Sequence, residues 1–112
     1  MTETKRSLKA TNEKLGELVI IRPSELATNG TTGVVAEGVY EGRKPNKFNA
    51  QKNDYFIRNG TTLYIVNETK SLGEQLNQLD GEEGKATVEV VYNGKLSTKN
   101  GRGYHDFEVF VK

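Results

Sequence analysis

Apolar and polar residues alternate along most of the chain after residue 33, which predicts strands rather than helices. Alternation or a short apolar run marks the segments 17–22, 34–41, 54–58, 61–68, 85–98 and 103–112. Pro23 should end the first segment, because proline cannot donate a hydrogen bond to a sheet ladder. Residues 24–33 contain Asn29-Gly30 and Gly33, and they are predicted to form a loop.

Two Asn-Gly pairs each separate two predicted strands, and this dipeptide is a strong signal for a two-residue hairpin turn. A turn at Asn59-Gly60 places Phe56 opposite Leu63 on the predicted core face. It places Tyr55 opposite Tyr64 on the less buried face. A three-residue loop would exchange these two faces, so both assignments stay open.

The second pair, Asn100-Gly101, predicts a hairpin with Tyr92 opposite Val109. Residues that face each other across two strands point to the same side of the sheet. The apolar residues of both strands then share one side, and we expect that side to pack on the core. They are Val88, Val90, Tyr92, Phe107, Val109 and Val111.

One helix is predicted, over residues 71–79. Ser71 can cap its first turn, and Glu74 stands where a capping-box partner belongs. The spacing of its leucines gives the helix one apolar side. These residues are Leu72, Leu76 and Leu79.

From residue 34 onward, the elements run in the order three strands, one helix and two strands, with Gly38 predicting a bulge or bend in the first. A five-stranded Greek-key barrel of the OB type, with a helix between strands 3 and 4, has this order. The sequence therefore predicts an all-β OB-fold domain over residues 17–112, with one short helix. Residues 1–16 are predicted to be a flexible N-terminal arm, with a short helix over 7–15 as the alternative. A small β-roll or an SH3-like barrel is the alternative fold.

The composition argues against most enzyme chemistries. The chain has no cysteine, which excludes disulfides and thiolate metal ligands, and its single histidine, His105, excludes a His-rich zinc site. Asp106 and Glu108 could share one side of a strand, but no third metal ligand is evident. We therefore expect no catalytic residues, no metal and no cofactor. The longest apolar run, residues 18–21, is too short to span a membrane, so we expect a cytoplasmic protein without a membrane partner.

The net charge of +1 hides a segregation of charge along the chain. Residues 43–58 and 93–104 are rich in cations, whereas residues 74–89 are rich in carboxylates. An OB-fold binds oligonucleotides on the face of its strands 2 and 3, between the loops that join strands 1–2 and 4–5. The basic clusters at 43–52 and 95–102 fall in these two loops. The candidate cations of the two segments are Arg43, Lys44, Lys47, Lys52, Arg58, Lys95, Lys99 and Arg102.

Aromatic residues near the two basic segments could stack on bases, which present flat π surfaces. The candidates are Tyr40, Phe48, Tyr55, Tyr64 and Tyr104. Each also has a structural alternative: Tyr55 and Tyr64 could be a cross-strand pair, Tyr40 could pack in the core, and Phe48 could fold back to cap the barrel. We expect His105 to be partly buried with a satisfied side chain rather than to act as a ligand.

A set of short motifs resembles one protein family. The motifs are EGVYEG at 37–42, DYF at 54–56, SLGEQL at 71–76, GEEG at 81–84, YNGK at 92–95 and GYHDFEV at 103–109. In this order they resemble the small OB-fold single-stranded DNA-binding proteins of bacteriophages, over about residues 33–112. The resemblance implies a protein of phage DNA replication or recombination in the bacterial host cytoplasm. Tryptophan is absent, so base stacking would depend on tyrosine and phenylalanine.

The sequence therefore predicts a non-enzymatic protein that binds single-stranded DNA with little sequence preference. Replication or recombination proteins are further expected partners, and the edge strands of a small barrel offer surfaces for a homo-oligomer. The alternative is a protein-interaction module, an accessory subunit that binds a replication or nuclease partner. That module would use the acidic segment 74–89.

Overall fold

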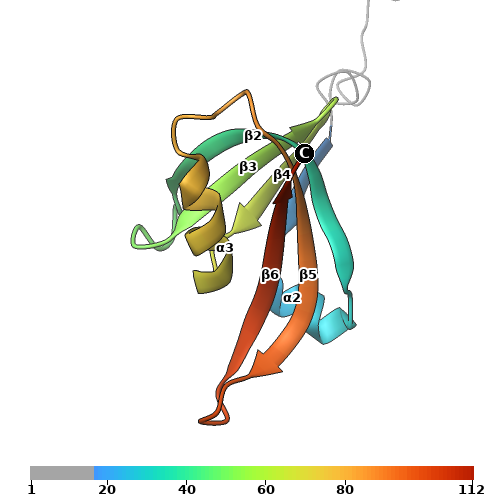
Figure 1. The fold of residues 1–112 in the computed structure, drawn as a ribbon, viewed down its shortest axis with the longest axis vertical. Helices are drawn as coiled ribbons and strands as arrows, with labels where there is room; N and C mark the ends of the chain where they lie inside the picture. The colour runs from blue at the N-terminus through green and yellow to red at the C-terminus, as the bar shows by residue number, and fades with distance from the viewer. Residues whose placement is uncertain (1–16) are drawn as a thin grey trace, which may run out of the picture.

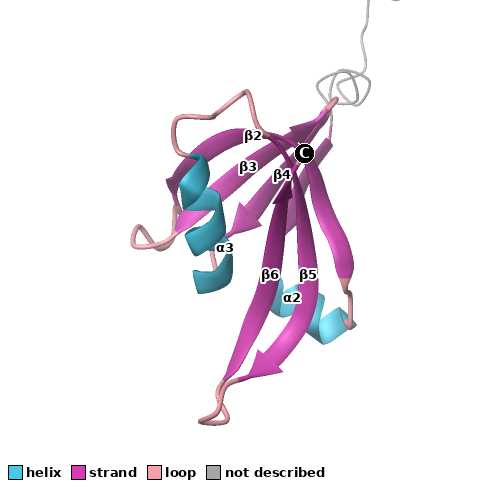
Figure 2. Cartoon of the chain, in the orientation of Figure 1, coloured by secondary structure: helices cyan, strands magenta, loops and turns pink. Residues whose placement is uncertain are grey.

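The computed structural model describes residues 17–112, which form one open six-stranded mixed sheet with short helices (Figures 1 and 2). The predicted arm at 1–16 and its alternative helix lie outside the described residues. The elements are β1 (Glu17–Ile21), α2 (Pro23–Asn29), β2 (Gly33–Pro45), β3 (Asn53–Asn59), β4 (Thr62–Asn67), α3 (Lys70–Leu76), the 3₁₀ helix η1 (Asn77–Leu79), β5 (Thr87–Ser97) and β6 (Gly103–Val111). The prediction of a mostly β chain is confirmed.

The strands lie in the order β1-β4-β3-β2-β5-β6. Strands β2, β3 and β4 pair antiparallel in sequence, and β5 returns through α3 to pair with β2, which is Greek-key connectivity. Strand β1 adds a sixth strand, parallel to β4. The prediction of five strands is therefore wrong by one, because the apolar run before Pro23 joins the same sheet. The sheet is not closed.

Strand β2 is long and bends between the two halves of the sheet, as Figure 1 shows. Gly38 has a φ of +151°, and a Cβ built there would lie 2.2 Å from the carbonyl oxygen of Arg58. Only glycine lets the two backbones approach so closely. The ladder between β2 and β3 shifts register between Tyr40 and Gly42. The predicted bend is present, with its bulge nearer Gly42 than Gly38.

The β3–β4 hairpin does not have the predicted faces. Asn59 pairs with Thr62, so the turn residues are Gly60 and Thr61, and Tyr55 lies opposite Val66. Tyr55 and its same-side neighbour Ile57 are fully buried, whereas Phe56 is half-buried on the outer side. Both sides of β3 carry large apolar or aromatic groups, so alternation alone could not identify the core side.

The β5–β6 hairpin has most of the predicted core face but not the predicted partners. Val88, Val90, Tyr92 and Phe107 are buried together, whereas Val111, predicted on the same face, is 58% exposed. Tyr92 lies opposite Phe107 rather than Val109, and the register shifts between Tyr92 and Gly94. The alternating valines correctly identified the core side, whereas this bulge is not visible as a pattern.

The helices also differ in part from the prediction. The loop predicted at 24–33 is wrong, because α2 begins at Pro23 and ends before Gly30, whose φ of +66° is left-handed. Proline at the first helical position and glycine after the last are normal helix boundaries. Helix α3 and η1 confirm the predicted helix and its buried leucines. Its N-cap, however, is Thr69, whose hydroxyl accepts a hydrogen bond from the backbone N–H of Leu72 at 3.2 Å.

None of the helices within residues 17–112 combines the length and the hydropathy needed to cross a membrane.

Candidate nucleic-acid interface

The loop between β2 and β3 is ordered by its own side chains. The Asn46 Oδ1 atom accepts hydrogen bonds from the backbone N–H groups of Phe48 and Asn49, at 2.8 and 3.0 Å. The Asn46 amide also donates to Asp54 at 3.0 Å, which fixes the loop to β3. The loop nevertheless leaves the Phe48 side chain 92% exposed. A large apolar ring is therefore held in water by a hydrogen-bonded loop, rather than folded back on the sheet.

Lysines stand before and after Phe48 in the sequence of this part of the chain. Lys47 and Lys52 lie in the same loop and are exposed, and Lys44 precedes the loop at the end of β2. The Lys44 ammonium lies 5.9 Å from the ring centroid of Phe56, on the outer side of β3. We call this group the loop surface. It consists of Lys44, Lys47, Phe48, Lys52 and Phe56.

The turn between β5 and β6 carries the second basic group. Thr98 organises it: its N–H donates to the carbonyl of Arg102 at 2.8 Å, and its hydroxyl accepts from the N–H of Arg102 at 3.2 Å. Tyr104, on the β6 side, is 41% exposed. We call this group the hairpin surface. It consists of Lys95, Lys99, Arg102 and Tyr104.

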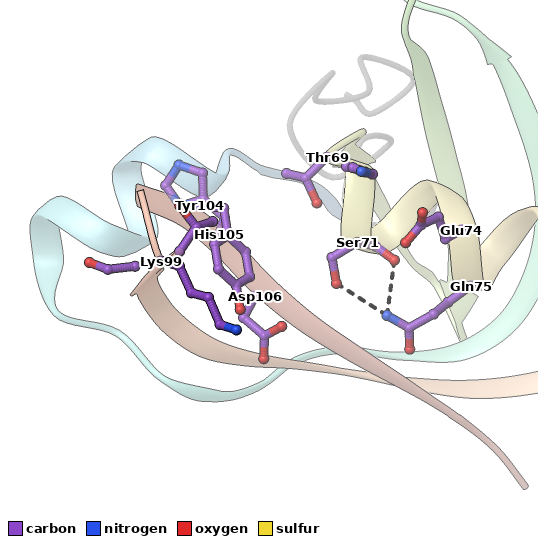
Figure 3. A pocket seen from close by; sticks show the side chains of 11 residues that line it. Thr69, Ser71, Glu74, Gln75, Lys99, Tyr104, His105 and Asp106 are labelled. Atoms are coloured by element: carbon purple, nitrogen blue, oxygen red, sulfur yellow. Dashed lines mark hydrogen bonds between the residues drawn. The ribbon is translucent and has the colours of Figure 1, made fainter. Parts of the chain in front are cut away.

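A groove of about 640 Å³ separates the first turn of α3 from the hairpin surface (Figure 3). Lys70 and Lys99 contribute cations to its walls, and Glu74 and Asp106 contribute carboxylates. The remaining lining groups are mostly hydroxyls and amides, from Thr69, Ser71, Gln75, Ser97, Thr98 and Tyr104. The sequence prediction missed Lys70, which lies outside both basic segments and enters the site only because α3 packs against β6.

Helix α3 connects the two surfaces physically. The backbone N–H of Asn53, at the base of the β2–β3 loop, donates to the Glu68 carboxylate at 2.6 Å. The backbone N–H of Glu68 donates back to the carbonyl of Asn53 at 3.1 Å, two residues before α3 begins. In Figure 1, the first turn of α3 lies between the β2–β3 loop and the β5–β6 turn. The two surfaces therefore flank one short helix.

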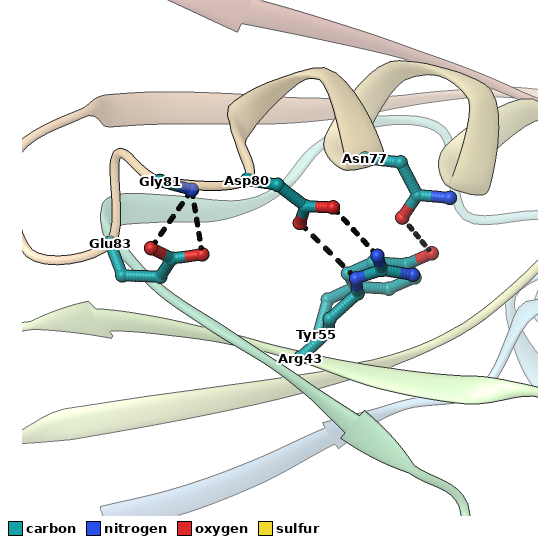
Figure 4. A network of polar contacts seen from close by, with 6 residues as sticks. All are labelled: Arg43, Tyr55, Asn77, Asp80, Gly81 and Glu83. Atoms are coloured by element: carbon teal, nitrogen blue, oxygen red, sulfur yellow. Dashed lines mark hydrogen bonds and ion pairs between the residues drawn. The ribbon is translucent and has the colours of Figure 1, made fainter.

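Two of the predicted aromatic residues are not available to a ligand. Tyr40 and Tyr55 are fully buried, and burial raises the pKa of each phenol to about 12. The Tyr55 hydroxyl donates to Asn77 at 3.0 Å (Figure 4). The prediction that Tyr55 faces a ligand is therefore wrong. Tyr64 is half-buried and packs against the core, so the predicted Tyr55–Tyr64 pair does not form.

Two of the predicted cations are engaged in ion pairs. Arg43 forms a bidentate pair with Asp80, with donor–acceptor distances of 3.2 and 2.6 Å (Figure 4). Arg58 pairs with Glu41 at 3.0 Å on the outer side of the sheet. Charge neutralised within the fold attracts a phosphate less strongly than a free cation does. Arg43 and Arg58 therefore fit the interface less well than the loop lysines.

His105 is half-buried, as predicted. Its Nδ1 atom lies 2.9 Å from the Tyr92 hydroxyl, and burial together with the nearby Lys95 lowers its pKa. A neutral imidazole with a hydrogen-bond partner is a structural group of the hairpin. Among residues 17–112 there is no cluster of three or more histidine or carboxylate side chains that could hold a metal ion.

Comparison of the chain with protein-family models, curated proteins and solved structures found no match. Function is therefore inferred from the two surfaces and the groove between them.

Proposed function

We propose that this protein binds single-stranded DNA with little sequence preference and without catalysis. The observation that carries the proposal is the display of Phe48, 92% exposed, on a hydrogen-bonded loop among lysines. An exposed aromatic ring offers every base a stacking partner, worth about 1–3 kcal/mol per base. The lysines on either side suit a phosphate backbone, and their contacts carry no sequence information.

The topology supports an OB-type site. Strands β2 to β6 have Greek-key connectivity with α3 between the third and the fourth of them, and β1 is an addition beside β4. The loop surface then corresponds to the loop between the first and second barrel strands, and the hairpin surface to the loop between the fourth and fifth. OB-folds use these two loops for oligonucleotides. A role in phage DNA replication or recombination, in the bacterial host cytoplasm, is part of the proposal through the motif resemblance.

The acidic segment 74–89 supports the alternative interaction module less well. Asp80 is paired with Arg43, and the Glu83 carboxylate accepts from the backbone N–H of Gly81 at 3.0 Å (Figure 4). Asp80 joins the connection between η1 and β5 to β2, and Glu83 orders that connection internally. Fewer of the segment's carboxylates remain for a basic partner, so we do not propose this function.

The test is the binding of fluorescently labelled oligo(dT), followed by anisotropy at several salt concentrations. We expect affinity to fall with salt, with a log–log slope of about −0.7 for each phosphate neutralised. Phe48→Ala should weaken binding by about 1–3 kcal/mol and change the free energy of unfolding by less than about 0.5 kcal/mol.

Phe110→Ala is the matched control, because Phe110 is also an exposed phenylalanine but lies on β6 outside both surfaces. We expect this variant to bind oligo(dT) as the parent does. Equal binding by the parent and Phe48→Ala, or binding that is independent of salt, would refute the proposal.

A further inference from the structure

The outer edge of β6 has no neighbouring strand among the described residues, and α3 lies along it instead. Two side chains of α3 bond the backbone of that edge. The Ser71 hydroxyl donates to the carbonyl of Phe107 at 2.7 Å and accepts from its N–H at 3.1 Å. The Gln75 amide donates to the same carbonyl at 2.7 Å, and its oxygen accepts from the N–H of Val109 at 2.6 Å.

These bonds fix how far β6 can slide along α3. Apolar packing by Leu72 and Leu76 holds the helix on the core, but such packing is not directional. The four bonds from Ser71 and Gln75 are directional and end on specific backbone atoms. They set the position of β6 relative to the helix, and hence the position of the hairpin surface at the end of β6.

We propose that Ser71 and Gln75 are positioning residues that hold the hairpin surface at a fixed separation from the loop surface, so that one DNA strand engages both. This inference rests on the proposed function. We call the four hydrogen bonds from Ser71 and Gln75 to β6 the clamp. A chain of hydrogen bonds supports the proposal, because Asn53 and Glu68 join the β2–β3 loop to the start of α3, and the clamp joins α3 to β6. Both side chains also line the groove, and the role proposed here is their hold on β6 rather than a direct contact with DNA.

The physical basis is effective concentration. A strand bound to one surface presents its next nucleotides to the other, and the second contact is then intramolecular. That gain depends on geometry, because it disappears when the two sites cannot be occupied at once. Loss of the clamp should therefore lower the affinity for long oligonucleotides, which reach both surfaces. It should leave the affinity for short ones, which occupy a single surface, unchanged.

The experiment compares Gln75→Met with the parent on oligo(dT) of about 4 and about 16 nucleotides, which bracket OB-fold site sizes. Gln78→Met is the matched control, because the Gln78 amide donates only to the helix carbonyl of Glu74, at 3.0 Å. For Gln75→Met we expect a loss of about tenfold or more on the long oligonucleotide. On the short one we expect a change within about twofold, as for Gln78→Met on both.

A purely structural role would lower the affinity for both oligonucleotide lengths by the same factor. That result would overturn the inference, while the proposed function of DNA binding would stand. Failure of the parent to bind either length would overturn the proposed function and the inference together. Should Gln75→Met not fold, Ser71→Ala and Ser71→Thr replace it. The alanine variant should show the length-selective loss, and the threonine variant, which keeps the hydroxyl, should restore long-oligonucleotide binding. Without that restoration the clamp is not the cause.

Discussion

The second half of β2 and the loop that follows it contain the same kinds of residue, aromatic and basic, in opposite environments. The Tyr40 ring is fully buried, the exposed Arg43 guanidinium is paired with Asp80, and the neighbouring buried Tyr55 donates its hydroxyl hydrogen bond to Asn77. A few residues later, Phe48 stands in water among lysines. The first group, Tyr40, Arg43 and Tyr55, which we call the closed end, joins the connection after α3 to the sheet. In the loop surface, the Lys44 ammonium lies 5.9 Å from the centroid of the half-buried Phe56 ring, whereas the Phe48 ring is 92% exposed.

The difference shows that residue type alone does not reveal which side chains a small β domain exposes. An aromatic residue near a cation in the sequence can be fully buried, as Tyr40 is, or almost fully exposed, as Phe48 is. The distinction depends on whether the fold brings a partner from a distant segment, as Asp80 is brought to Arg43 across 37 residues of sequence. Variants at the two groups should therefore separate into those that lower stability and those that lower binding.

The largest expected effect is on stability at the closed end. Tyr55→Ala removes a fully buried ring and leaves a cavity, so we expect the free energy of unfolding to fall by about 3–5 kcal/mol, by analogy with other buried aromatic residues. Urea denaturation measures this. Tyr104→Ala is the control, since its ring is 41% exposed and the change should be far smaller. Comparable losses for the two tyrosines would remove the distinction between buried and displayed aromatic groups.

The second expected effect is a loss of stability in alkali, to which the closed end contributes. Burial raises the pKa of Tyr40 and of Tyr55 from 10.0 to about 12, and it also raises the pKa of Tyr92 on β5. Between these values the unfolded chain loses tyrosine protons that the native state keeps, so the free energy of unfolding falls as pH rises from about 10 through about 12. Denaturation at a series of pH values, with tyrosinate absorbance as a second readout, checks this. All tyrosines ionising together near pH 10, with the fold intact, would contradict it.

The smallest expected effects distinguish one cation of each group. Arg43→Ala breaks a partly exposed ion pair, so we expect a loss of stability of about 0.2–1 kcal/mol with an unchanged salt slope for oligo(dT). Lys47→Ala should leave stability unchanged and make the slope shallower by about 0.7. Chemical denaturation and anisotropy on the same two variants check both outcomes. The reverse result would mean that Arg43, not the loop, meets the phosphates.

Some of the fold could be predicted from the sequence, because strong periodicity identified the β5–β6 core side and the leucines of α3. The β3 faces could not, since Tyr55 and Phe56 are both large aromatic residues and only the distant Asn77 favours burying the tyrosine. Helix α2 had local signals, Pro23 and Gly30, which are equally compatible with a loop. In the site, the loop lysines and Phe48 were identified from the sequence. The pairing of Arg43 and the contribution of Lys70 depend on tertiary contacts.

The close approach of Gly38 to the carbonyl of Arg58 has a consequence for how the domain can vary. At most surface positions of a strand a methyl group can be added at little cost, but here it would meet a backbone oxygen at 2.2 Å, and neither backbone can yield without opening the sheet. In a saturation library, position 38 should therefore accept no substitution, although glycine contributes no side-chain contact of its own. The bend of the sheet thus depends on the absence of a Cβ atom at position 38, and any distant homologue that keeps the bend must keep glycine there.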